Sequence, residues 1–335
     1  MKKQISIKKV AQEANVSNAT VSLVLNGKDK DGRVGKVTAE KVRKIAKELN
    51  YEPNHLARGL RMGKSNTIGL IVADISNPFF ATLAFHIQEY AEKFGYSVII
   101  TNSNESDEKF DKILQVLFRQ QVDGLIIVPT ENSIKSVEKL IERKIPLVLL
   151  DRWFPDLQTC HVVIENYQVS KKAVQYLVDN NCKKIALISY KTNLPHMTER
   201  GRGYEDVMKK EGLYNENLIK EVNYISIEED IKKSMDDLFA YQGNDIIDGI
   251  FFTTNSISMI GIKYLLENKI KILEDVKIVC FDKSDAFDFA KFNIPYVLQP
   301  IPEMGRMAVE VLINQIVNGI ITPSKIELFA KLIEE

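Results

Sequence analysis

Short runs rich in β-branched residues alternate with amphipathic segments from Thr67 onward, and this alternation constrains the fold more than any other feature of the chain. The first four runs, read as strands, are TIGLIV, YSVIIT, DGLIIV and IPLVLL, and the helices between them are expected to start near Phe79, Asp107 and Ser133. A second series has strands at HVVI, KIALIS, KEVNYI, DGIFFT and VKIVCF. Because this alternation is typical of parallel sheets with crossover helices, the sequence predicts two similar α/β lobes.

The second lobe is expected to contain helices near residues 166–179, 199–211, 228–240 and 256–268. The break near residues 151–163 separates the lobes, and YVLQP with a helix over 302–317 is expected to return to the first lobe. The first lobe is therefore expected to comprise about 66–163 plus 293–322, and the second about 164–292 plus 323–335. Since ligands bind at the carboxyl ends of strands in such sheets, a cleft between the two lobes is the expected binding site.

The segment Ile7–Asn26 precedes this body, and its pattern is typical of two short helices joined by a tight turn. Ser6 is a candidate N-cap of the first helix, and Ser17 is a candidate N-cap of the second. The inward face of the second helix carries Val21, Val24 and Leu25. Its outward face carries small or polar residues that suit contact with base edges and phosphates in a major groove: Asn18, Ala19, Thr20 and Ser22. An ordinary helical hairpin is the alternative.

A third helix, capped by Thr38, is expected to close an all-α head over residues 1–52. Residues 53–65 follow as a hinge or linker in which leucines stand among basic residues. The segment is too short and too glycine-rich to be a stable helix alone, so we expect it to become helical only with a partner. The polar and basic candidates for DNA contact in this hinge are Asn54, His55, Arg58 and Arg61.

The charge of the chain is unevenly distributed. Residues 1–65 contain 15 Lys and Arg against 6 Asp and Glu, a net charge of +9, whereas the remainder contains 30 against 39, a net charge of −9. A basic head on an acidic body is typical of a phosphate-binding module joined to another domain. The three cysteines have no metal-ligand spacing, so neither a metal nor a cofactor is expected. No apolar run approaches the roughly 18 residues of a membrane span, and we expect a cytoplasmic protein with no membrane contact.

Several motifs together resemble the lactose-repressor (LacI) family of bacterial transcription regulators along essentially the whole chain. They are IKKVAQEANVSNATVSLVLNG, YEPNHLARGLRMGKSNTIGLIVADISNPFF, VDGLIIVP, LVLLDR, and CFD before LQP. The resemblance implies a helix-turn-helix head, a hinge helix that folds on operator DNA, and a periplasmic-binding-protein-like effector domain that dimerises. Separately, we expect no enzymatic activity, because the sequence has no nucleophile elbow, no glycine-rich phosphate loop after the first strand and no metal cluster.

The resemblance assigns roles to individual residues of the head. Asn18 and Ala19 match base-reading positions, while Ser17, Thr20, Ser22 and Asn26 match phosphate-contacting or supporting positions. Leu23 is a departure, because many members have an arginine there and a leucine offers only apolar contact, for example to a thymine methyl. Leu60 matches the hinge leucine that wedges into the minor groove, with Ala57 beside it.

In the cleft, the resemblance assigns effector contacts to both lobes. Phe79 and Phe80 of the SNPFF motif, which begins with Ser76 and Asn77, match an aromatic wall, and Tyr224 matches an aromatic on the opposite lobe. Arg200 matches the ligand-binding arginine, whose planar fork can bind paired hydroxyls or a carboxylate. The remaining candidates are polar or charged: Asn77, Asp151, Arg152, His196, Asn255, Ser256 and Asp282. Ser256 stands where the family usually has Asp.

The sequence therefore predicts a DNA-binding regulator, in the repressor class, that is controlled by a small molecule, with a sugar or sugar derivative favoured over a nucleobase. We expect a homodimer on operator DNA, because LFAKLIEE is followed by no leucine heptads. A free-standing solute-binding protein is the first alternative, and it should carry a signal peptide and no basic head. An α/β enzyme is the second, and it should show a nucleophile elbow, a phosphate loop or a metal cluster.

Overall fold

The computed structural model describes residues 6–25, 27, 29, 33–49, 51, 64–240, 246–289, 293–319 and 321–334. Contacts within the chain divide it into two units, Met1–Ser65 and Asn66–Glu335. The division falls at the end of the segment 53–65 that we expect to be the hinge. Most of that segment lies outside the described residues, so the hinge helix stays a prediction.

The head contains three helices, α1 (Ile7–Ala14), α2 (Asn18–Leu25) and α3 (Lys36–Glu48). The Ser17 hydroxyl accepts a hydrogen bond from the Thr20 amide at 3.1 Å, as expected of an N-cap. Ser6 has the extended backbone of an N-cap, but its side chain makes no capping hydrogen bond. The third helix begins two residues before the predicted cap Thr38, with Gly35 as N-cap. One small core joins the three helices: Val10, Ala11, Ala14, Val21, Val24, Ala39, Val42 and Ala46.

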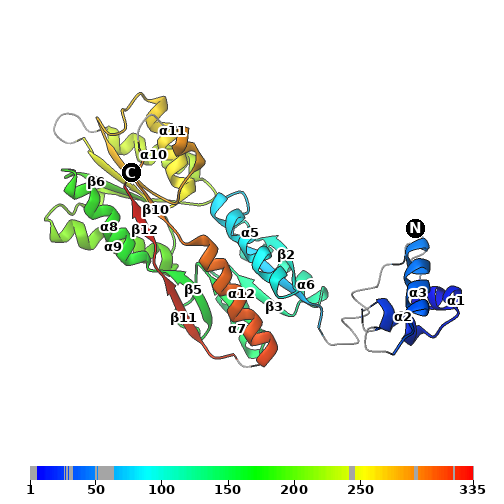
Figure 1. Ribbon diagram of the computed structural model, residues 1–335. Coiled ribbons are helices and arrows are strands. Elements are labelled where there is room, and N and C mark those ends of the chain that lie inside the picture. The colour runs from blue at the N-terminus through cyan, green and yellow to red at the C-terminus, as the bar shows by residue number, and fades with distance from the viewer. Residues whose placement is uncertain are drawn as a thin grey trace. The chain divides into compact units, whose positions relative to one another are not determined.

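The body contains two six-stranded sheets of mostly parallel strands, as predicted for an α/β protein with crossover helices (Figure 1). The first sheet has the order β11-β5-β4-β3-β1-β2, and the second has the order β12-β10-β9-β8-β6-β7. The strands of the first are β1 (Thr67–Val72), β2 (Ser97–Asn102), β3 (Gly124–Ile127), β4 (Leu147–Leu150), β5 (Cys160–Ile164) and β11 (Ser324–Leu328). Those of the second are β6 (Ile185–Tyr190), β7 (Ile219–Val222), β8 (Gly249–Phe252), β9 (Lys277–Phe281), β10 (Tyr296–Leu298) and β12 (Lys331–Ile333).

Helices connect successive strands in both lobes. The first lobe has α5 (Pro78–Lys93), α6 (Asp107–Arg119), α7 (Ile134–Glu142) and α12 (Ile301–Asn318). The second has α8 (Asn166–Asp179), α9 (Pro195–Lys210), α10 (Ile227–Phe239) and α11 (Asn255–Glu267), with 3-10 turns at Glu216–Leu218 and Asp285–Phe289. Local caps set several helix starts: the side chains of Asn77, Ser106 and Thr254 each accept from a backbone amide at the beginning of α5, α6 and α11.

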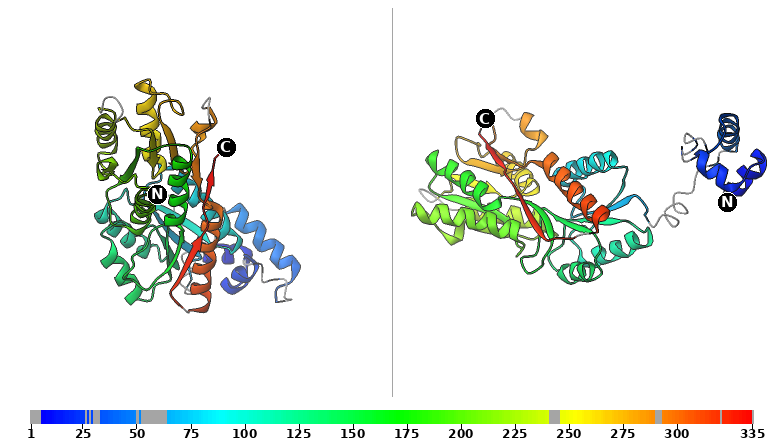
Figure 2. Two further views of the ribbon diagram at one scale, coloured as in Figure 1. Left: turned by 90° about the vertical axis from the view of Figure 1, so that its left-hand side faces the viewer. Right: turned by 60° about the horizontal axis from the view of Figure 1, so that its bottom comes forward.

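Two strands near the C-terminus lie in the lobe opposite to the one predicted. We expected residues 293–322 in the first lobe, but β10 pairs with β9 in the second sheet. We expected residues 323–335 in the second lobe, but β11 pairs with β5 in the first, and only β12 lies in the second. The red ribbon in both views of Figure 2 runs from the first sheet into the second. The chain thus passes between the lobes three times, after β5, after β10 and after β11.

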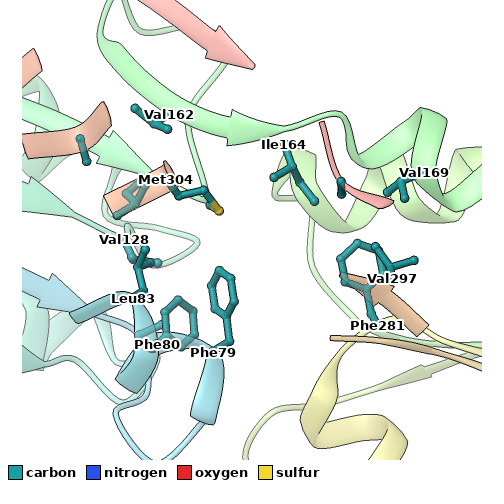
Figure 3. Packing of buried hydrophobic residues seen from close by; sticks show 14 of the residues in the cluster. Phe79, Phe80, Leu83, Val128, Val162, Ile164, Val169, Phe281, Val297 and Met304 are labelled. Carbon is teal, nitrogen blue, oxygen red and sulfur yellow. The ribbon is translucent and has the colours of Figure 1, made fainter. Parts of the chain in front are cut away.

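The lobe membership of β5 also differs from the prediction. The run HVVI was read as the first strand of the second series, but β5 lies in the first sheet, where it pairs in parallel with β4 and with β11. One hydrophobic cluster spans both lobes, because side chains of α5 and α12 and side chains of α8 and α9 belong to it. Figure 3 shows Phe79 and Phe80 on one helix of the first lobe, with Phe281 on a strand of the second. The lobes are therefore packed together, and their strand ends form the walls of one site.

Candidate functional site

The predicted DNA-contacting residues of the head lie on or beside α2. Asn18 and Ala19 are exposed at the start of this helix, as a base-reading position requires. Thr20, Ser22 and Leu23 are half-buried. The Ser17 hydroxyl, within 2.9 Å of the Thr20 hydroxyl, both caps the helix and remains at the surface, and Ser6 is exposed before α1. The other predicted contacts lie outside the described residues: Asn26, Asn54, His55, Ala57, Arg58, Leu60 and Arg61.

In the body, a small cavity of about 40 Å³ lies where the two sheets present the carboxyl ends of their strands. Ten of the eleven predicted effector residues line it: Asn77, Phe79, Phe80, Asp151, Arg152, His196, Arg200, Tyr224, Ser256 and Asp282. Asn255 is the exception, because it is buried and its side-chain nitrogen lies 3.5 Å from the Lys283 carbonyl oxygen. A direct contact of Asn255 with an effector therefore stays a prediction.

Arg152 is neutralised by a carboxylate that the sequence prediction missed. Its two terminal nitrogens donate to Glu105 at 2.8 and 2.6 Å, the bidentate geometry that guanidinium and carboxylate groups prefer. Its Nε lies 3.7 Å from Asp151 Oδ2. The negative charge of Glu105 raises the pKa of Arg152 despite the burial of the side chain. Arg152 is thus a fixed structural cation whose strongest hydrogen bonds are already made within the protein.

Arg200 is buried and held by neutral acceptors. Its Nε donates to Asn166 Oδ1 at 2.8 Å, and its Nη1 donates to the Thr253 carbonyl at 2.7 Å. Its guanidinium carbon lies 3.5 Å from the centre of the Phe281 ring. Burial lowers the pKa of Arg200 to about 10, although the negative charges of Asp151 and Asp282 oppose this shift. These contacts fix the guanidinium plane of Arg200, which also lines the cavity.

Two buried carboxylates offer acceptors to a ligand. Burial raises the pKa of Asp151, and burial raises the pKa of Asp282 to about 6, while the positive charge of Arg200 opposes both shifts. Gln299 donates to Asp282 Oδ1 at 2.7 Å and so fixes that carboxylate. His196 is also buried, its Nδ1 has no hydrogen-bond partner among the described residues, and its pKa is lowered well below the usual value by burial and the nearby arginines. A neutral imidazole therefore lines the same cavity as the two carboxylates.

The apolar and aromatic walls come from both lobes. Phe79 and Phe80 meet edge to face, with ring centres 4.9 Å apart. Tyr190 and Tyr224 of the second lobe lie with ring centres 6.1 Å apart, and the Tyr224 hydroxyl is hydrogen-bonded to Asp74 of the first lobe. The amide of Asn77 donates to the Ser256 hydroxyl at 3.3 Å. These two contacts cross between the lobes and hold the two walls of the cavity together.

An outer chamber of about 240 Å³ adjoins the small cavity and shares six lining residues with it: Glu105, Arg152, Tyr190, His196, Met197 and Tyr224. Six residues of the small cavity were missed by the sequence prediction. Met197 lies on α9, and the other five lie at a strand end or within three residues after one: Asp74, Glu105, Tyr190, Thr254 and Gln299. The carboxyl-end rule for parallel sheets is the signal that could have found them.

Comparisons with known proteins agree with this architecture. A family model for bacterial regulatory proteins of the lacI family matches residues 6–54, and a model for the periplasmic binding protein domain matches residues 68–320. The chain belongs to the lacI family of bacterial regulatory proteins. It is 32% identical to the ribose operon repressor of Halalkalibacterium halodurans over 98% of this chain and 95% of that protein. It is 30% identical to the transcriptional regulator KdgR of Bacillus subtilis over 98% of this chain and 96% of that protein.

Solved structures of the family extend the likeness to the fold. The lac repressor dimer bound to operator matches with a TM-score of 0.82 at 19% identity, over 99% of this chain and 98% of that chain. A LacI regulator from Alkaliphilus metalliredigens, complexed with D-xylulofuranose, matches with a TM-score of 0.68 at 26% identity, over 80% of this chain and 97% of that chain. This family member is accordingly a DNA-binding transcriptional regulator with an effector domain. Among the described residues, no helix is long and apolar enough to cross a membrane.

Proposed function

We propose that this lacI-family regulator acts as a homodimeric repressor in the cytoplasm and that its effector is an uncharged sugar bound between the two lobes. The observation that carries the effector class is the charge of the small cavity. Four carboxylates line it against two guanidinium groups, and Arg152 is already paired with Glu105. An anionic sugar would add negative charge to a site with a surplus of carboxylates, which is unfavourable at low dielectric.

The polar groups suit hydroxyl ligands. Asp151 and Asp282 can each accept from a sugar hydroxyl, while Arg200 and neutral His196 can donate to sugar oxygens. The faces of Phe79 and Phe80 provide apolar surface for a sugar ring. The relatives support the same class, because one is a ribose operon repressor and another has bound D-xylulofuranose. We propose no catalytic step, and this proposal rests on the regulatory function of the relatives.

For the head, we propose that Asn18 and Ala19 contact bases and that Ser17, Thr20 and Ser22 contact phosphates or support α2. Residues 53–65 would serve as the hinge that folds on DNA. Closure of the lobes on a sugar changes operator affinity if the sugar binds the DNA-competent and DNA-incompetent states unequally, typically by about 1–3 kcal/mol of coupling.

A thermal-shift screen of the full chain tests the effector class, because a ligand that binds the folded state raises Tm. The panel should contain neutral pentoses and hexoses, the matching sugar phosphates and sugar acids, and purines. We expect stabilisation by at least one neutral sugar and none by its phosphorylated or acidic counterpart. Stabilisation by anionic sugars or purines alone would contradict the proposal. A sugar that stabilises should then change the anisotropy of a labelled duplex selected from a randomised library.

A further inference from the structure

A second cavity, of about 390 Å³, lies in the first lobe at the opposite end of the sheet from the effector site. Leu147 and Cys160, the first residues of β4 and β5, line this cavity. The effector site instead lies where these and the other strands end, with Asp151 directly after β4. The two cavities share no lining residue, so the second is a separate feature of the lobe.

The walls of this second cavity are predominantly apolar. They come from the end of α7, the start of β4 and the segment after α12: Ile141, Ile145, Pro146, Leu147, Ile321 and Pro323. Ile321 is 38% exposed and therefore stands at the mouth. The volume falls within the range of roughly 300–1,000 Å³ that is usual for small-molecule sites. A cavity of this volume with apolar walls is suited to the apolar part of a small ligand.

Most polar groups of the cavity are already satisfied within the protein. The Gln315 side chain accepts from the Leu147 amide at 2.9 Å and donates to the Leu147 carbonyl at 3.1 Å. The Cys160 thiol donates to the Thr322 carbonyl at 3.0 Å. Thr159 differs: it is only 4% exposed, and its hydroxyl has no hydrogen-bond partner among the described residues. A buried hydroxyl without a partner is unfavourable, and a ligand that carries an acceptor would reduce this cost.

A cation also borders the cavity. Lys144 lines it from the turn after α7, and its side chain is exposed. Within the part of the chain that the structure describes, its ammonium group makes no ion pair. A positive charge beside apolar walls favours a ligand with an anionic end and an apolar body.

We propose that this cavity is a second ligand site, which takes a small carboxylic acid with an aliphatic chain. The chain would lie on the isoleucine and proline walls, and the carboxylate would lie near Lys144, within reach of the Thr159 hydroxyl after a small adjustment of the loop. The site is independent of the sugar site, because none of its residues contacts the inter-lobe cavity.

Calorimetric titration of octanoate into the full chain tests this proposal, with 1-octanol as the uncharged probe of equal chain length. We expect saturable binding of octanoate at one site per chain. We expect 1-octanol to bind about 1.4- to fivefold more weakly, since an exposed ion pair contributes roughly 0.2–1 kcal/mol. Lys144→Met should weaken octanoate to the same degree. Lys139→Met, an exposed lysine on α7 that does not line the cavity, is the matched control and should change nothing.

Two further variants locate the site. Ile321→Trp fills the mouth and should abolish octanoate binding, while its exposed position keeps the cost in stability small. Thr159→Val removes only the hydroxyl, and octanoate should bind it more weakly than the parent chain. Titration that shows no saturable binding would overturn the proposal. Binding that persists unchanged in both Lys144→Met and Ile321→Trp would overturn it as well, because the octanoate would then lie elsewhere.

Discussion

Asp151 and Asp282 occupy equivalent positions in the two lobes. Each directly follows the third strand in the order of its sheet, β4 in the first and β9 in the second. Each is buried, and each has a left-handed backbone, with φ of 65° and 69°. Both carboxylates lie near enough to Arg200 to affect its pKa. The two lobes thus direct matching carboxylates toward one shared guanidinium, and this arrangement makes the site sensitive to pH.

The contribution of Asp282 to stability should fall as pH rises from about 4 to about 6. Burial raises the pKa of Asp282 to about 6 from the ordinary 3.8, so the unfolded chain releases this proton before the folded chain does. Between these values the folded state binds more protons, and the free energy of unfolding decreases with pH. Urea unfolding at pH 4.5 and 7 measures this. Asp282→Asn should flatten the profile, and a slope that the variant leaves unchanged would assign the effect to other groups.

Sugar binding should have the opposite pH dependence. A hydroxyl donates more strongly to an ionised carboxylate than to a protonated one, so affinity should rise as pH increases through about 6. At pH 5 only about a tenth of Asp282 is ionised, which limits the loss to about tenfold relative to pH 7.5. Titration of the stabilising sugar at both values checks this. An affinity that is equal at both pH values would show that Asp282 does not accept from the sugar.

Removal of Arg200 should cost far more stability than removal of its neighbour Arg202. Arg200→Ala leaves Asn166 Oδ1 and the Thr253 carbonyl without their buried donor and removes the positive charge near two buried carboxylates, and we expect a loss of about 3–5 kcal/mol. Arg202 lies on the same helix but is 57% exposed, and Arg202→Ala should cost less than about 1 kcal/mol. Urea unfolding of both variants gives the comparison. Equal losses would mean that the contacts of Arg200 are not what stabilises this part of the fold.

Local signals predicted many elements well. The bounds of α8, Asn166–Asp179, were predicted residue for residue, and α6 starts at the predicted Asp107 because Ser106 caps it. By contrast, α9 starts at Pro195, four residues before the predicted Glu199. Proline at the first helical turn is favourable, and this signal extends the helix backward so that His196 and Arg200 lie one turn apart.

The lobe membership of β10 and β11 could not be predicted from local pattern. These strands are only three and five residues long. Their lobe membership depends on their pairing partners, β9 for β10 and β5 for β11, and β5 lies far before β11 in the sequence. Glu105 was missed for a similar reason, because only the fold brings it to Arg152, 47 residues later in the chain. Periodicity identifies a strand, but the identity of its neighbour depends on tertiary packing.

Asn18→Ala should weaken binding to the selected operator without destabilising the chain. Asn18 is exposed at the start of α2, so its side chain contributes little to folding, whereas a good base contact contributes about 1–3 kcal/mol of discrimination. Fluorescence anisotropy should therefore show about a 5- to 150-fold loss on the operator and little change on a scrambled duplex. An equal loss on both duplexes would instead assign Asn18 to phosphate contact.

Two helical glycines should respond to alanine in opposite directions. A Cβ at Gly261 of α11 would lie 2.5 Å from Cζ of the buried Phe252 ring and closer still to Cε1, so Gly261→Ala must displace this ring. We expect a loss of about 1–3 kcal/mol, as for other overpacked cores. A Cβ at Gly201 of α9 would meet no heavy atom within 4 Å, and Gly201→Ala should gain up to about 1 kcal/mol from helix propensity. Urea unfolding of both variants checks the pair. A gain at Gly261 would show that α11 can move away from β8 at little cost.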